Sequence, residues 1–109
     1  MRPFSWLLIF LLAVSVINYP NPLNPKGGEV EKFDCTLAAT TEAFLYIYDL
    51  AARIIYQTPF NLQGGSTNRV TWNGYNGYHE PVGNGIYLYQ IIDQARHRIG
   101  KGKIWVINK

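Results

Sequence analysis

Hydrophobic and polar positions alternate with a period of two in segment 30–37, VEKFDCTL. Phe33, Cys35 and Leu37 are separated there by charged or polar residues, which points one set of side chains to one face of a strand. Similar short apolar runs recur along the chain, and helical periodicity is nearly absent. The predicted strands are 16–19, 29–37, 43–48, 53–56, 68–72, 85–92 and 103–107.

Segments dense in glycine, asparagine and proline separate these runs. They read NPKGG (24–28), QGGSTN (63–68), WNGYNGYHEPVGNG (72–85) and IGKG (99–102). Such residues form turns and adopt positive φ at little cost. Seven short strands with these separators, and no linker or repeat, predict a single all-β sandwich of immunoglobulin-like architecture over residues 16–109.

The first 15 residues have the composition of a secretory signal. Arg2 precedes an apolar core at 4–14, and the small residues Ala13 and Ser15 favour cleavage after Ser15. A membrane span needs about 20 apolar residues, so the run is short for that role. We expect a cleaved leader and a periplasmic, surface or secreted protein. An uncleaved membrane anchor and a strand of the fold are the alternatives.

The composition argues against several classes of protein. Hydrophobic residues make up 48% of the chain and charged residues 16%, which argues against disorder. The net charge of +3 is too small to indicate nucleic-acid binding. Cys35 is the only cysteine, so neither an intrachain disulfide nor a cysteine zinc site can form. We expect a buried thiol.

The segment YPNPLNP (19–25) contains prolines at 20, 22 and 25. Each proline lacks an amide donor and restricts the backbone, so neither a helix nor a central strand can run through the segment. An extended edge or a lead-in to the first strand is predicted.

Five motifs then carry a family resemblance. YPNPLNP, LYIYDLAAR (45–53), VTWNG (70–74), PVGNGIYLYQI (81–91) and GKIWVINK (102–109) occur in this order. Over residues 16–109 the chain resembles the immunoglobulin-like domain of the flagellar hook-capping protein, which is similar to the C-terminal sorting domains of type IX secretion cargo. The resemblance implies that the proline stretch is the first edge strand, where proline hinders pairing of the edge with strands of other chains. It implies structural roles for Tyr19, Pro20, Asn21, Pro22, Pro25, Tyr48, Asp49, Trp72, Gly74, Gly85 and Tyr87.

Two departures from the family pattern change what we expect. Ala52 stands where the family usually has glycine; at positive φ it would cost about 1–2 kcal/mol, which predicts a turn of different shape. Asn73 replaces the aspartate of a Trp-Asp-Gly motif, and Asn76 and His79 stand at the usual acidic and glycine positions. The loop thus lacks hard anionic ligands, and no metal or other cofactor is predicted.

Catalytic chemistry has little support. Neither His79 nor His97 has a nucleophile or carboxylate at a sequence spacing typical of a catalytic site, so no enzyme is predicted. GNG (83–85) and GKGK (100–103) are not followed by a helix, so turn glycines are favoured over a phosphate loop.

The aromatic residues allow a second hypothesis. An exposed ring can stack on a sugar, although rings at alternating strand positions normally fill a core, as expected for Trp72. Tyr75 and Tyr78 lie in a glycine-rich loop, where core packing and glycan contact stay equally open.

Basic residues concentrate near the C-terminus, where Arg96, Arg98, Lys101 and Lys103 are the candidate protein-contact residues. A solvated hairpin is one interpretation. The resemblance to sorting domains suggests instead an edge open to strand addition, with the cations steering a partner.

These observations predict a non-catalytic exported module for protein contacts in secretion sorting, surface attachment or scaffolding. Its partner would be export machinery, a surface component or a second copy, with membrane contact only through an uncleaved leader. A carbohydrate-binding module and a truncated remnant of a larger secreted protein are the alternatives. The leader argues against hook capping itself.

Overall fold

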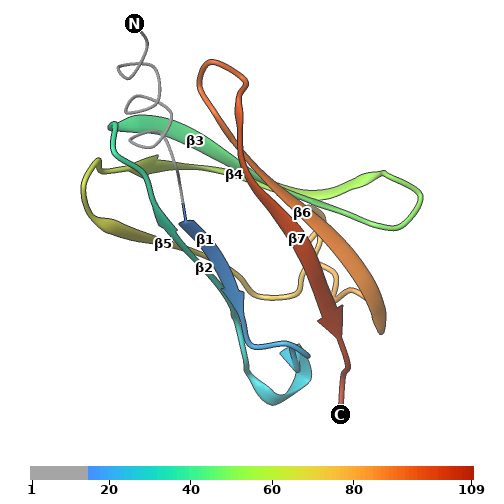
Figure 1. Ribbon diagram of the computed structural model, residues 1–109. Helices are drawn as coiled ribbons and strands as arrows, with labels where there is room; N and C mark the ends of the chain where they lie inside the picture. Colours follow the sequence, from blue (N-terminus) through green and yellow to red (C-terminus); the bar gives the residue numbers. More distant parts are fainter. Residues whose placement is uncertain (1–14) are drawn as a thin grey trace, which may run out of the picture.

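The computed structural model describes residues 15–109, which form two antiparallel sheets packed face to face (Figure 1). One sheet has the order β1-β2-β5, from Ser15–Tyr19, Glu31–Thr36 and Thr67–Trp72. The other has the order β4-β3-β6-β7, from Ile54–Leu62, Thr41–Tyr48, Gly85–Asp93 and Arg98–Val106. A 3-10 turn, η1, spans Pro25–Gly27. The prediction of a seven-stranded all-β sandwich is confirmed.

The predicted leader lies outside the described residues, apart from Ser15, which begins β1. None of the helical structure within residues 15–109 is long and apolar enough to cross a membrane.

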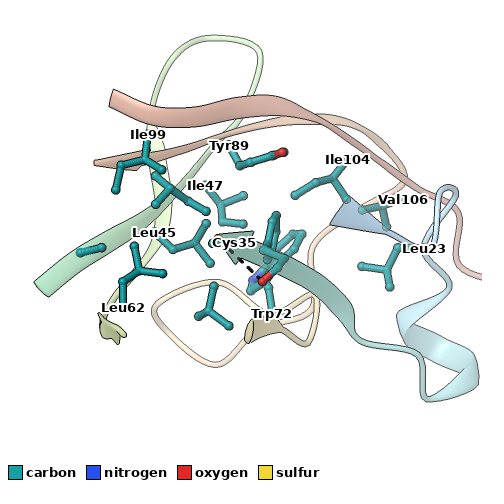
Figure 2. Packing of buried hydrophobic residues seen from close by; sticks show 14 of the residues in the cluster. Leu23, Cys35, Leu45, Ile47, Leu62, Trp72, Tyr89, Ile99, Ile104 and Val106 are labelled. Atoms are coloured by element: carbon teal, nitrogen blue, oxygen red, sulfur yellow. Dashed lines mark hydrogen bonds between the residues drawn. The ribbon is translucent and has the colours of Figure 1, made fainter. Parts of the chain in front are cut away.

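The core lies between the sheets (Figure 2). Cys35 is fully buried, as predicted, and Trp72 is 1% exposed, which confirms its expected core position. Phe33 packs edge to face on Tyr89 with ring centroids 4.8 Å apart, so the two sheets are joined by aromatic contact as well as by aliphatic packing. The remaining core members are Leu23, Ala43, Leu45, Ile47, Leu62, Val70, Val82, Ile91, Ile99, Ile104 and Val106.

Two strands, β4 and β7, extend well beyond their predicted bounds. β4 continues through Pro59 to Leu62, which is possible because β4 is an edge strand and proline there breaks no ladder. β7 begins at Arg98, so the prediction that 99–102 is a turn was wrong. The turn precedes Arg98, where Asp93 Oδ1 accepts a hydrogen bond from His97 N at 2.8 Å.

Close packing explains the glycines of β7. A Cβ on Gly100 would lie 2.7 Å from Val16 Cγ2, and one on Gly102 would lie 2.7 Å from Tyr89 Cε2. Glycine within a strand can therefore mark a close approach rather than a turn.

The proline segment does not form the first edge strand. That strand, β1, ends at Tyr19, and the prolines follow it. The segment instead carries the chain to the other sheet, where Leu23 forms a parallel bridge with Val106 of β7. Leu23 N donates to Trp105 O at 2.7 Å, and Ile107 N donates to Leu23 O at 2.9 Å. The fully buried Leu23 side chain drives this crossing.

Ala52 has a φ of 65°, so alanine adopts the left-handed conformation in the β3–β4 turn, at the position where the family usually has glycine. Asp49 holds the turn, because its Oδ1 accepts hydrogen bonds from Ala51 N at 2.9 Å and Arg53 N at 3.0 Å.

Candidate functional site

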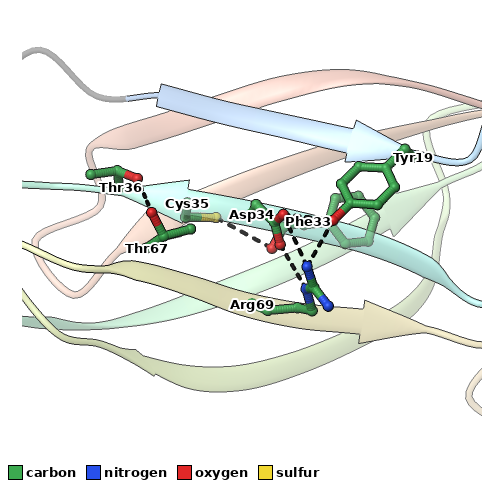
Figure 3. A network of polar contacts seen from close by, with 7 residues as sticks. All are labelled: Tyr19, Phe33, Asp34, Cys35, Thr36, Thr67 and Arg69. Carbon is green, nitrogen blue, oxygen red and sulfur yellow. Dashed lines mark hydrogen bonds and ion pairs between the residues drawn. The ribbon is translucent and has the colours of Figure 1, made fainter.

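The outer face of the three-stranded sheet carries a network of polar contacts (Figure 3). Arg69 Nε lies 2.8 Å from Asp34 Oδ1, and Arg69 Nη2 donates to Tyr19 Oη at 2.8 Å. Tyr19 Oη in turn donates to Asp34 Oδ2 at 2.7 Å. Hydrogen bonds from Arg69 and then Tyr19 lower the pKa of Asp34. This face is a solvated, internally paired surface.

The outer face of the four-stranded sheet is apolar at its centre. The register places Phe44 opposite Ile92 and Tyr48 opposite Leu88 on the central strands. Ring centroids are 6.5 Å apart between Phe44 and Tyr46 and 6.3 Å apart between Tyr46 and Tyr48. We call this surface the outer sheet face; its apolar members are Phe44, Tyr46, Tyr48, Ile86, Leu88, Ile92 and Trp105.

Within the described residues, nothing covers these side chains completely, and all seven remain partly accessible to solvent. Trp105 is 48% exposed, and the other six are half-buried. The sequence prediction missed this surface, although a signal was present. Segments 44–48 (FLYIY) and 86–89 (IYLY) are apolar without interruption, a pattern typical of strands covered on both faces rather than one.

Cations border the outer sheet face along β7. The register places Arg98 opposite Ile92, Lys101 opposite Gln90 and Lys103 opposite Leu88. All three cations are exposed. Lys101 and Lys103 alternate with Gly102, and the register shift between Ile91 and Ile92 brings Arg98 to the same face, so the three form one row beside the apolar centre. The fourth predicted contact residue, Arg96, lies in the preceding turn with a φ of 72°.

The edge of β7 is partly occupied by the chain itself, so the interpretation of an edge open to strand addition is limited to the residues before Lys103. Besides the bridge to Leu23, Asn18 Nδ2 donates to Lys103 O at 3.0 Å, and Trp105 N donates to Asn21 Oδ1 at 2.9 Å. Main-chain groups already bonded in this way are not available for strand addition from Lys103 onward. The face of the sheet is therefore the more accessible surface.

A second candidate surface is a shallow groove beside loop 73–79. Tyr78 is 85% exposed and Tyr75 is 40% exposed, so neither belongs to the core. The groove runs from the β3–β4 turn across the start of β4 to this loop. Its lining residues are Asp49, Arg53, Ile54, Ile55, Tyr56, Gln57, Asn73, Tyr75, Asn76, Gly77, Tyr78 and His79.

Several family-motif residues make contacts within the fold. Gly74 has a φ of 84°, and a Cβ there would lie 2.6 Å from Pro25 Cγ, so the loop and the proline segment touch. Tyr87 Oη donates to Gly83 O at 2.8 Å, and Trp72 Nε1 donates to Tyr75 O at 2.8 Å. These contacts join loop 73–79 and the residues before β6 to neighbouring parts of the fold.

The two histidines lie apart from any buried polar cluster. His79 is exposed in the loop at a φ of 64°, and Nδ1 of the exposed His97 lies 3.5 Å from Asp93 Oδ2. Within residues 15–109 no three His, Cys, Asp or Glu side chains are grouped to hold a metal ion.

A buried polar cluster joins β1, β2 and β6. Glu31 is fully buried; its Oε2 accepts a hydrogen bond from Asn18 Nδ2 at 2.8 Å, and its Oε1 has no partner within the described residues. Burial raises the pKa of Glu31 to about 7. Tyr89 Oη donates to Asn18 Oδ1 at 3.0 Å, and burial raises the pKa of Tyr89 to about 12.

Neither protein-family models nor curated proteins give a match. Among solved structures, the fold is similar to part of dimeric latent PorU from Porphyromonas gingivalis, with a TM-score of 0.74 and 22% identity over 88% of this chain. It is also similar to part of PorZ from the same organism, described as an essential bacterial surface component of the type-IX secretion system, with a TM-score of 0.57 and 25% identity over 86% of this chain. The matched region spans 9% of PorU and 12% of PorZ. The chain therefore shares the fold of a small part of each protein.

Proposed function

We propose that this chain is a non-catalytic exported β-sandwich module that binds another protein through the outer sheet face. The observation that carries this proposal is an apolar centre beside a row of three cations, Arg98, Lys101 and Lys103. Protein interfaces commonly have this anatomy, with an apolar, aromatic-rich centre and a polar rim.

The contrast between the two sheets supports the choice of surface. On the three-stranded sheet Asp34 and Arg69 pair with each other, whereas the cations of β7 have no carboxylate within ion-pair distance in residues 15–109. Unpaired surface cations can steer an acidic partner toward the apolar centre.

The cellular role that fits best is secretion sorting, surface attachment or scaffolding. The fold likeness to a part of PorZ, a surface component of a secretion system, supports an exported or cell-surface location. The partner would then be export machinery, another surface component or a second copy of the chain.

The test compares two triple variants in the native host. The first is Arg98→Gln, Lys101→Gln, Lys103→Gln; the control, Lys26→Gln, Lys32→Gln, Lys109→Gln, removes equal charge elsewhere. Cell fractions and medium are analysed for the tagged full chain, and urea midpoints confirm that both variants fold. We expect the first variant alone to lose its wild-type distribution. Equal distributions for wild type and both variants would overturn the proposal.

A further inference from the structure

We propose that the groove beside Tyr78 binds a neutral oligosaccharide. This site goes beyond the proposed protein contact, because it uses none of the cations of β7. It lies between the start of β4 and loop 73–79. The ligand class follows from four features: exposed rings, a loop held in place by its own hydrogen bonds, uncharged polar groups, and charges that are already paired.

Two tyrosines of one short loop supply the rings. Tyr78 is 85% exposed and Tyr75 is 40% exposed, and both line the groove. Across the groove, Ile54 is 53% exposed. A flat ring with one accessible face suits the C–H surface of a sugar, and tyrosine adds a hydroxyl that can reach sugar oxygens.

The loop is ordered by its own contacts before any ligand binds. Asn76 Oδ1 accepts hydrogen bonds from Tyr78 N at 2.8 Å and Glu80 N at 3.0 Å. Gly77 N donates to Ile55 O at 2.8 Å, which ties the loop to the edge of β4. A pre-ordered backbone lowers the entropy lost on binding, which matters for a shallow site with few contacts.

Uncharged polar groups are available in the groove. Within residues 15–109, the side-chain amide of Gln57 and the Nδ2 of Asn73 have no hydrogen-bond partner, and both residues are exposed. An amide offers both donors and acceptors, as hydroxyl groups of a sugar require.

The charges that line the groove are engaged with the protein. Arg53 Nε lies 2.8 Å from Asp49 Oδ2, at the β3–β4 turn. Beside the groove, Glu80 Oε1 accepts a hydrogen bond from Asn76 Nδ2 at 3.1 Å. With one cation and one anion already paired in the lining, the groove favours a neutral ligand over an acidic one.

The test titrates the folded chain with cellohexaose, mannohexaose, chitohexaose and the hexasaccharide of galacturonic acid, followed by calorimetry and NMR. We expect at least one neutral hexasaccharide to bind, with affinity about tenfold weaker for Tyr78→Ala and retained by Tyr78→Phe, since the ring provides the contact. Ile17→Ala, at an exposed apolar residue of β1 outside both candidate surfaces, is the control and should bind like wild type.

Three results would overturn the oligosaccharide site. They are no binding of any neutral hexasaccharide at about 10 mM, binding of the acidic hexasaccharide alone, and equal affinity of wild type and Tyr78→Ala. A Tyr78→Ala variant that disturbs cellular distribution without affecting sugar binding would also overturn it and assign the loop to a protein partner. None of these results bears on the triple variant of β7, so the two proposals fail independently.

Discussion

Asn18 on β1 donates a hydrogen bond through Nδ2 to Oε2 of the fully buried Glu31 on β2, at 2.8 Å. The same amide also donates to the main-chain oxygen of Lys103 on β7, at 3.0 Å. One side chain therefore ties the first strand of one sheet to the last strand of the other. The carboxyl group it holds lies where water is excluded, so its protonation is coupled to folding.

Stability should fall as pH rises from about 5 to 8, because burial raises the pKa of Glu31 from 4.5 to about 7. Below pH 4.5 both states are protonated, and no penalty applies. Between pH 4.5 and 7 the carboxyl group of Glu31 is deprotonated in the unfolded chain but still protonated in the folded chain, which favours unfolding. Above pH 7 the free energy of unfolding has fallen by its full amount, about 3 kcal/mol. Urea unfolding followed by fluorescence at several pH values measures this loss.

Glu31→Gln is the control, since it removes the titrating group and keeps a similar shape. Its stability should be nearly constant over the same pH range. Lowered pKa values at Asp34 and Asp49 affect stability only as pH falls below about 4, outside this window. An identical fall in the variant would show that another group is responsible.

Sequence periodicity predicted the sandwich because its strands alternate and its turns are rich in glycine and asparagine. It failed at Gly100 and Gly102, which local chemistry interprets as turn residues. Their cause lies in Val16 and Tyr89, which are distant in sequence and close only in the folded chain. A close approach of this kind cannot be derived from local propensity.

The sequence predicted only some residues of the candidate surfaces, because the others are recognised only from contacts between distant strands. Lys101 and Lys103 stand out by charge, and Tyr78 stands out by its glycine-rich loop. Phe44 and Tyr48 do not stand out, because an apolar residue has the same local signature on an inner or an outer face. Only the register with Ile92 and Leu88 shows which side they occupy.

Gly102→Ala should destabilise the fold by about 1–3 kcal/mol, because its Cβ would lie 2.7 Å from the buried ring of Tyr89. Gly83→Ala is the control, since a Cβ there meets nothing within 4 Å; it should be neutral or stabilising by up to about 1 kcal/mol. Urea midpoints compare the two variants. Equal midpoints would contradict the close approach of β7 to the core.

Ala52→Gly should stabilise the chain by about 0.5–1 kcal/mol. Ala52 has a φ of 65°, and the relief of about 1–2 kcal/mol of left-handed strain outweighs the added flexibility of the unfolded chain. Ala51 precedes it and has no positive φ, so Ala51→Gly should lower the free energy of unfolding by about 0.4–1 kcal/mol. Thermal melts give both values. A loss for Ala52→Gly as large as that for Ala51→Gly would mean that the turn does not hold alanine in this conformation.

Cys35 should react with a disulfide reagent only when the sandwich opens. Its side chain is fully buried, and burial raises the thiol pKa to about 11, so the reactive thiolate is scarce at pH 8 and enclosed by the core. Labelling of the native chain should be slower than labelling in urea by about three orders of magnitude or more. Gly102→Ala should accelerate it in proportion to its loss of stability, and Gly83→Ala should not. Fast labelling of the native wild type would instead place Cys35 in a locally mobile part of β2, outside the cooperative core.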